Sequence, residues 1–160
     1  MNELAIIESA PKELSWPDKI AWLAAKIAPL EGSKVEDDDF EIRHSFKGVW
    51  YIREFDLPAD YIFIGRTHLL GHIVKLIRGT TWVETPTGRV RYCAPAMTHT
   101  QPGHQMVVQT ITPITAQSWH LNPDGCRDIA ELESEYFAPP SVVLQRGAQL
   151  IQETAKWLEQ

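Results

Sequence analysis

Between residues 40 and 122 the chain reads as a succession of short β-strands. Runs rich in Val, Ile, Thr, Tyr, Phe and Trp recur between Gly- and Pro-containing turns, and no helical periodicity interrupts them. Eight short runs at regular spacing predict a β-sandwich or a jelly-roll barrel. The expected strands are Glu41–Ser45, Trp50–Phe55, Tyr61–Thr67, His72–Ile77, Thr81–Glu84, Val90–Ala94, Gln105–Ile111 and Thr115–His120.

Three turn signals between these runs indicate particular turn geometries. Leu57-Pro58-Ala59-Asp60 places a proline where its fixed backbone angle favours a turn. Thr85-Pro86-Thr87-Gly88 predicts a hairpin loop closed by a left-handed glycine, and Pro102-Gly103 predicts a type II turn. These turns support the division of the segment into short strands.

Helical patterns flank the strands on both sides. Ser15-Trp16-Pro17-Asp18 opens an amphipathic helix, with a cap, an early proline and an acidic first turn. After the strands, Asp128 caps a short helix that runs through Phe137, and Ser141 caps a last one. The chain therefore divides into an N-terminal arm and helix (1–39), a β-barrel (40–122) and two C-terminal helices (123–160).

Composition excludes several classes of partner. The net charge of −6 and the scattered Lys and Arg residues argue against nucleic-acid binding. No stretch is long and apolar enough to span a bilayer, and the N-terminus lacks the pattern of a signal peptide. Cys93 and Cys126 form neither a disulfide framework nor a Cys-x-x-Cys site, as expected of a cytoplasmic protein.

Four of the six histidines fall on rows that strand alternation turns toward the core. His68 follows the row of Ile62 and Ile64, His72 begins the row of Val74 and Leu76, and His104 precedes Met106 and Val108. His120 ends a row of small residues that includes Ala116 and Ser118.

Buried imidazoles need polar partners, and a shared metal ion would satisfy several of them at once. The alternative is that each histidine is a separate hydrogen-bonded core residue, and the spacing alone favours neither. His44 and His99 are expected outside the group.

Glu54 is a carboxylate that shares a strand face with the apolar residues Trp50 and Ile52. On such a face it would act as an acid/base group with a raised pKa, as a ligand, or as a structural partner of an arginine, with Arg66 and Arg78 as candidates. Other chemistries find no support. The sequence has no Gly-rich phosphate loop before a helix and no Gly-x-Ser-x-Gly motif, and neither cysteine has a neighbouring base.

The stretch from Gly65 to Gly79 resembles the first motif of the cupin superfamily, which has a glycine, a His-x-His pair, a glutamate and a closing glycine. Counted back from Gly79, His72 falls at the glutamate position, His68 at the second histidine and Arg66 at the first. Pro102-Gly103-His104 looks like a compressed second motif. The resemblance covers about residues 40 to 122 and implies a double-stranded β-helix, usually dimeric.

The chain is also similar in pattern to small cupin-like proteins of phages and prophages. The similarity rests on short motifs with fixed residue types: Tyr51-Ile52-Arg53-Glu54, Pro58-Ala59, Gly65 through His72, Ala94-Pro95, Pro102-Gly103 and the closing His120. It implies a phage-related protein of the host cytoplasm and supports a bound metal, but it transfers no particular reaction.

Together these observations predict a mainly β, cupin-like jelly-roll barrel with a His-rich metal site for a small molecule. The expected cofactor is a divalent metal (Zn, Fe, Mn or Ni) held by His68, His72, His120 and His104. Arg66 and Trp50 are the expected ligand-binding residues, Glu54 is the candidate acid/base, and a homodimer is expected. Two alternatives remain: a non-catalytic protein that sequesters a nucleotide-like molecule, and a structural or host-interaction protein in which the barrel is scaffold.

Overall fold

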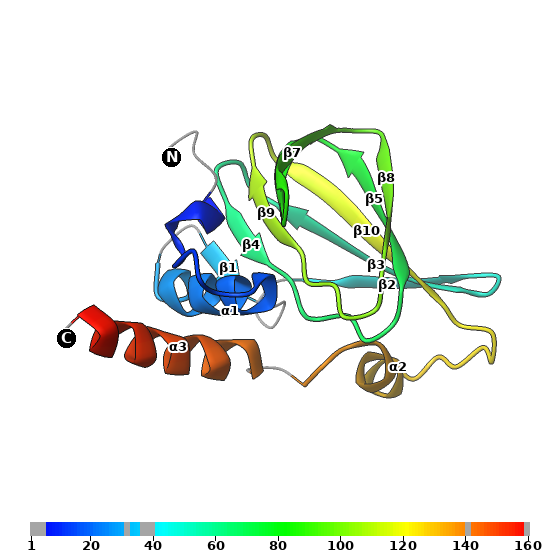
Figure 1. Cartoon of the computed structure of the whole chain (residues 1–160). Helices are drawn as coiled ribbons and strands as arrows, with labels where there is room; N and C mark the ends of the chain where they lie inside the picture. The colour runs from blue at the N-terminus through cyan, green and yellow to red at the C-terminus, as the bar shows by residue number, and fades with distance from the viewer. Residues whose placement is uncertain (1–5, 31–32, 36–40, 140–141, 159–160) are drawn as a thin grey trace.

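The computed structural model describes residues 6–30, 33–35, 41–139 and 142–158. Two five-stranded sheets face each other and form a barrel, with one helix against one sheet, a second packed on that helix and a third below one end (Figure 1). The elements are η1 Ile6–Ser9, α1 Trp16–Ile27, β1 Ser33–Val35, β2 Arg43–Lys47, β3 Trp50–Leu57, β4 Ile62–Ile64, β5 His72–Arg78, β6 Thr80–Thr85, β7 Gly88–Cys93, β8 Ala96–Thr100, β9 Val107–Thr110, β10 Ile114–Leu121, α2 Ile129–Tyr136 and α3 Val142–Leu158.

The sheet topology is that of a jelly roll. One sheet has the order β1-β4-β9-β6-β7 and the other β2-β3-β10-β5-β8, so strands distant in sequence lie side by side in both. All pairings are antiparallel except that of β1 with β4. The predicted mainly β, cupin-like barrel with flanking helices is confirmed.

Beyond shifts of one or two residues at strand ends, three differences separate the predicted strands from the structure. Each of the eight expected strands is present, but β4 ends at Ile64, three residues before the predicted end. The sequence analysis missed β8, whose exposed Met97 and His99 alternate with half-buried and buried neighbours. It also missed β1, which pairs with β4 from the segment assigned to the N-terminal arm.

The register of β3 against β10 decides which side chains face the barrel interior. Tyr51 pairs with His120, Arg53 with Ser118, and Phe55 with Ala116, and this row points inward. Alternate positions point outward, so Glu54 and its partner Gln117 lie on the outer face of the sheet. Along β5, His72 and Leu76 belong to the inward row.

Helix α1 packs against the first sheet, and α3 packs on α1 (Figure 1). Ser15 caps α1 by accepting a hydrogen bond from the Asp18 N–H. The two helices pack so closely at Gly147 that a Cβ atom there would overlap the backbone carbonyl of Ala21. The predicted cap of α3, Ser141, lies outside the described residues. No helix in the described part of the chain is long and apolar enough to cross a membrane.

Helix α2 closes one end of the barrel. Asp128 caps it, as predicted, through a hydrogen bond from the Glu131 N–H. Its buried residues Leu132 and Tyr136, with the following Phe137, pack against Tyr51 on β3. The helix therefore brings aromatic side chains to the end of the barrel where the histidines lie.

Candidate functional site

Three of the four histidines predicted as ligands come together at the end of the barrel that α2 closes. The ring centroids of His68 and His72 are 3.7 Å apart, those of His72 and His120 5.0 Å, and those of His68 and His120 5.5 Å. The rings are close to parallel, with interplanar angles of 10–20°. We call these three residues the histidine cluster.

His72 and His120 reach the cluster by the predicted route, strand alternation, whereas His68 does not. Because β4 ends at Ile64, and Ile62 and Ile64 pack with the helices, a continued strand would not carry His68 inward. The chain instead leaves the strand at Gly65. The His68 N–H then donates to the His104 carbonyl at 2.9 Å, and an isolated β-bridge joins His68 to Phe137.

The cluster is buried, and burial keeps it neutral. The relative exposure of His68, His72 and His120 is 9%, 4% and 1%. Burial lowers the pKa of His72 to about 4 and that of His120 to about 2. Burial, followed by the neighbouring His72 and His120, also holds the pKa of His68 well below its ordinary value. At pH 7 all three are neutral imidazoles, which is the form that binds metals.

The three imidazoles differ in their hydrogen bonds. His72 Nδ1 lies 2.6 Å from Thr100 Oγ1, and His120 Nε2 lies 3.2 Å from Ser118 Oγ. Both ring nitrogens of His68 are buried and have no hydrogen-bond partner among the residues that the structure describes. An unpaired polar atom in an apolar interior is destabilising, so His68 is the member of the cluster that most needs a further ligand.

Two arginines and an aromatic ring border the cluster. The guanidinium carbons of Arg53 and Arg66 lie 4.4 and 4.7 Å from the centroid of the Phe137 ring. Glu133 on α2 forms ion pairs with both, at 3.4 and 3.6 Å. The Phe137 ring also contacts His68 edge to face, with the centroids 4.7 Å apart. These contacts connect α2 to the closed end of the barrel.

Sequence reasoning missed part of this border. Arg53 alternates with Glu54 along β3 and shares a face with Tyr51 and Phe55, and this alternation is the sequence signal for its place in the interior. The places of Glu133 and Phe137 depend on how α2 folds back on the barrel. No local pattern in the sequence shows that return.

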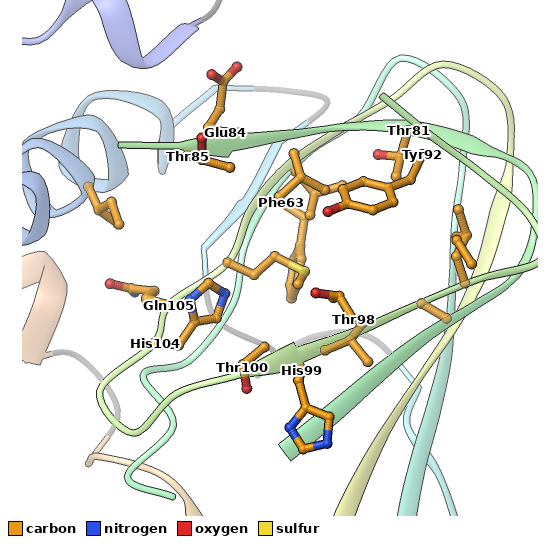
Figure 2. Close-up of a pocket in the computed structure, with 18 of the residues that line it drawn as sticks. Phe63, Thr81, Glu84, Thr85, Tyr92, Thr98, His99, Thr100, His104 and Gln105 are labelled. Atoms are coloured by element: carbon orange, nitrogen blue, oxygen red, sulfur yellow. The ribbon is translucent and has the colours of Figure 1, made fainter. Parts of the chain in front are cut away.

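His104 lies apart from the cluster, in the wall of a larger cavity inside the barrel. This cavity has a volume of about 390 Å³, whereas the space beside the cluster has about 50 Å³. Figure 2 shows His104 beside the same space as Phe63, Tyr92 and Thr98. Burial lowers the pKa of His104. The structure thus places the fourth predicted ligand in a different compartment from the other three.

Glu54 and Trp50 lie on the outer face of β3, away from the cluster. Glu54 Oε1 pairs with Arg43 Nη2 at 2.8 Å, and the Gln117 amide donates to its other oxygen. The Gln117 amide, followed by the Arg43 guanidinium, holds the pKa of Glu54 below its ordinary value. The structure therefore gives Glu54 an ion-pair partner that the sequence analysis had not named. Trp50 packs edge to face with Trp119.

The cluster has the nitrogen donors of a transition-metal site, but the distances between its rings are not those of imidazoles bound to one ion. Two imidazoles bound to one ion, each about 2.0 Å from it, have ring centroids roughly 4.5–5 Å apart. Two of the three separations are near this range or above it, and the 3.7 Å stack of His68 and His72 is too close. Among the described residues, no three His, Cys, Asp or Glu side chains are grouped so as to hold an ion as they stand.

The fold is the cupin-like jelly-roll barrel that the sequence predicts, with three histidines turned into one end. The sequence matches no protein-family profile and no curated protein. Solved structures with a similar barrel include a cupin-2 domain protein from Shewanella frigidimarina (8% identity, TM-score 0.44, 54% of this chain and 84% of that one). A cupin domain from Bordetella pertussis is 16% identical, with a TM-score of 0.40, over 52% of this chain and 93% of that one. The cupin domain of an XRE-family transcriptional regulator from Enterobacter cloacae is 9% identical, with a TM-score of 0.43, over 50% of this chain and 93% of that one. At these values the likeness carries no argument about function.

Proposed function

We propose that this cupin-like protein binds a divalent transition metal through His68, His72 and His120. The proposal is supported by three neutral, buried imidazoles that come from separate parts of the barrel and meet at one end. Imidazole suits Zn, Fe, Mn and Ni alike, so the identity of the ion is left to measurement. His104 is not included, because it lies in the other compartment.

The observation that carries the proposal is the state of His68. Within the described part of the chain, its two ring nitrogens are buried and have no hydrogen-bond partner, although hydroxyl groups contact those of its two neighbours. A metal ion would supply the missing partner. A bound ion of this kind polarises an oxygen-bearing ligand or lowers the pKa of a bound water.

Arg53 and Arg66 would orient an anionic group of the small molecule that the site serves. Both guanidinium groups already pair with a carboxylate, that of Glu133, so the geometry suits a carboxylate-bearing ligand in its place. The Phe137 ring lies against both guanidinium groups on the side of α2. A ligand that replaced Glu133 would therefore displace the end of α2 as it bound.

Metal analysis of untagged protein tests the proposal. We expect about one equivalent of metal per chain, lost in the His68→Leu and His72→Leu variants and retained in His99→Leu, where the substituted residue is an exposed histidine. Protein without metal as purified, which also fails to bind Zn, Mn, Ni or Fe(II) in titration, would contradict it.

A stability measurement separates a metal ligand from a structural histidine. In metal-free protein, His68→Leu removes two unpartnered polar atoms and should leave the free energy of unfolding unchanged or raise it. In the presence of metal the same variant should be less stable than the wild type. A variant that is destabilised equally in both states would show that His68 is structural only.

Three further parts of the proposal rest on the sequence resemblance: a phage or prophage origin, a site of action in the host cytoplasm, and a homodimer. The homodimer is the most direct to check, by light scattering on the eluted protein. A monomer at all concentrations would remove this part and leave the metal proposal intact.

A further inference from the structure

The barrel encloses a second compartment that the metal proposal does not use. This cavity of about 390 Å³ falls in the size range of small-molecule sites. Phe55, Phe63, Val74 and Met106 line both this cavity and the small space beside the histidine cluster, and therefore form the wall between the two.

The walls of the cavity are largely apolar. Aromatic rings of Phe55 and Phe63, 5.6 Å apart, and of Tyr92 supply flat surfaces, and Met106 and Val108 add aliphatic area. Such walls gain free energy from burying an apolar body of similar size. The size and surface of the cavity thus suit a ligand that carries a ring or rings.

No charged group of the described lining is directed at the space. Lys and Arg are absent from the lining residues, and the one carboxylate among them is Glu84. Figure 2 shows the Glu84 side chain turned away from Phe63 and Tyr92, toward the helices. Arg89 lies 3.6 Å from it. A ligand with a net charge would be desolvated here without a counter-ion, which disfavours both anions and cations.

One polar atom of the lining residues, His104 Nε2, could form a further hydrogen bond. His104 Nε2 is buried and no described residue forms a hydrogen bond with it, although His104 forms part of the cavity lining. Met106, close by in the same lining, has a flexible side chain that can yield to an incoming group. A hydroxyl or carbonyl oxygen on the ligand would give this nitrogen the bond that the protein does not supply.

We propose that the barrel cavity binds an uncharged, ring-bearing small molecule whose single hydroxyl or carbonyl group hydrogen-bonds to His104 Nε2. The site is separate from the histidine cluster, so the proposal does not depend on a bound metal. It names a neutral ligand, and so differs from the anionic ligand that Arg53 and Arg66 suit and from a nucleotide, whose phosphates would meet no cation in this cavity.

Three matched probes test the proposal on the wild-type protein: 1-naphthol, naphthalene and 1-naphthoate, with binding followed by fluorescence at pH 7. The rings are the same and only the substituent differs. We expect 1-naphthol to bind roughly fivefold more tightly than naphthalene, because of one hydrogen bond, and naphthoate to bind more weakly than either. No saturable binding of naphthol, or naphthoate binding best, would overturn the proposal.

Two histidine variants locate the hydrogen bond. His104→Leu should remove the preference for naphthol over naphthalene and retain the binding of naphthalene, which also shows that the variant is folded. His99→Leu is the matched control, because His99 is exposed and its ring is turned away from the space in Figure 2. An unchanged preference in His104→Leu would exclude this residue as the partner. The same result with chelator and with added Zn would show that the site is independent of the metal.

Discussion

The two compartments of the barrel differ in what completes them. The cavity of about 390 Å³ is lined mainly by the barrel's own strands and the loops between them. The space of about 50 Å³ beside the histidine cluster is completed by Phe137, from the segment that follows the barrel. The apolar compartment is therefore formed mainly by the barrel, with Trp16, Pro17 and Ile20 of α1 also in its lining, whereas the polar one is completed by the segment that contains α2 and Phe137.

The difference in polarity between the two compartments follows from the inward-facing residues of three neighbouring strands, β10, β3 and β5. On β10 the row runs from His120 and Ser118 to Ala116 and Ile114, that is, from polar to apolar. The rows of β3 and β5 run in the same spatial sense, from Arg53 and His72 at one end to Leu57 and Leu76 at the other. One sheet thus gives the barrel a polar end and an apolar end.

The largest expected difference between the two compartments is their response to acid, because the histidine cluster should make the stability of the protein depend on pH. Each clustered histidine has a folded-state pKa below its ordinary value of about 6.5, so the unfolded chain binds more protons below that pH. The contribution of the neutral histidines to the free energy of unfolding is therefore fully present above about pH 6.5, and it is lost as the pH falls toward the folded pKa values. For metal-free protein at pH 5 the loss is about 2 kcal/mol for His72 and about 2 kcal/mol for His120, and the lowered pKa of His68 adds to it in the same direction.

Urea unfolding of chelator-treated protein between pH 7.5 and 5 measures this loss. The His72→Leu variant should show a shallower dependence by about one proton, and the exposed-site variant His99→Leu should follow the wild type. A free energy of unfolding that stays flat down to pH 5 would mean that the cluster opens to solvent, and the contrast between a closed and an open compartment would fail.

Truncation of Phe137 should lower the free energy of unfolding more than truncation of Met106, which lies in the wall between the two compartments. The Phe137 ring is 2% exposed and contacts two guanidinium groups and two imidazoles. Phe137→Ala should therefore lower the free energy of unfolding by about 3–5 kcal/mol. Met106→Ala is the comparison, because its side chain already borders an existing cavity and loses fewer contacts, so about 1–2 kcal/mol is expected. Equal costs in urea unfolding would remove the distinction.

The barrel could be predicted from the sequence because its signals are local. Turn residues and alternation recur within a few positions, and they fixed most strands as well as the inward rows of His72 and His120. The arrival of His68 beside them was predicted, but for the wrong reason, because β4 stops at Ile64 and the loop carries His68 inward. Alternation shows which residues share a face of a strand, and not which face is turned inward.

The closed end of the barrel could not be predicted, because its contacts join residues far apart in the chain. Arg53 and Glu133 are 80 positions apart, and the strand that carries Glu54 presents an apolar row on each face. Trp50 and Ile52 made the face of Glu54 look like core, whereas Tyr51 and Phe55 mark the true interior. The compartment that holds His104 likewise depends on how both sheets close.

Glu133 and Glu54 are two carboxylates in ion pairs with arginine, and they should respond differently to neutralisation. Glu133 joins Arg53 and Arg66, whose side chains are 7% and 10% exposed. Glu133→Gln leaves these guanidinium groups without their carboxylate, and since Glu133 itself is 30% exposed, we expect a loss of about 1–2 kcal/mol in unfolding free energy. Benzoate, which would no longer compete with Glu133, should bind several-fold more tightly to this variant than to the wild type.

The matched substitution on the outer face, Glu54→Gln, should have the smallest effect. Its partner Arg43 is 40% exposed and also pairs with Asp56, so solvent screens the interaction and a second carboxylate remains. The expected loss is below about 1 kcal/mol, with unchanged metal content and unchanged benzoate binding. Altered metal content in Glu54→Gln would connect the outer face to the histidine cluster and restore the role that the sequence first suggested for Glu54. A cost equal to that of Glu133→Gln would mean instead that docking of α2 adds no strength to the ion pairs at the closed end.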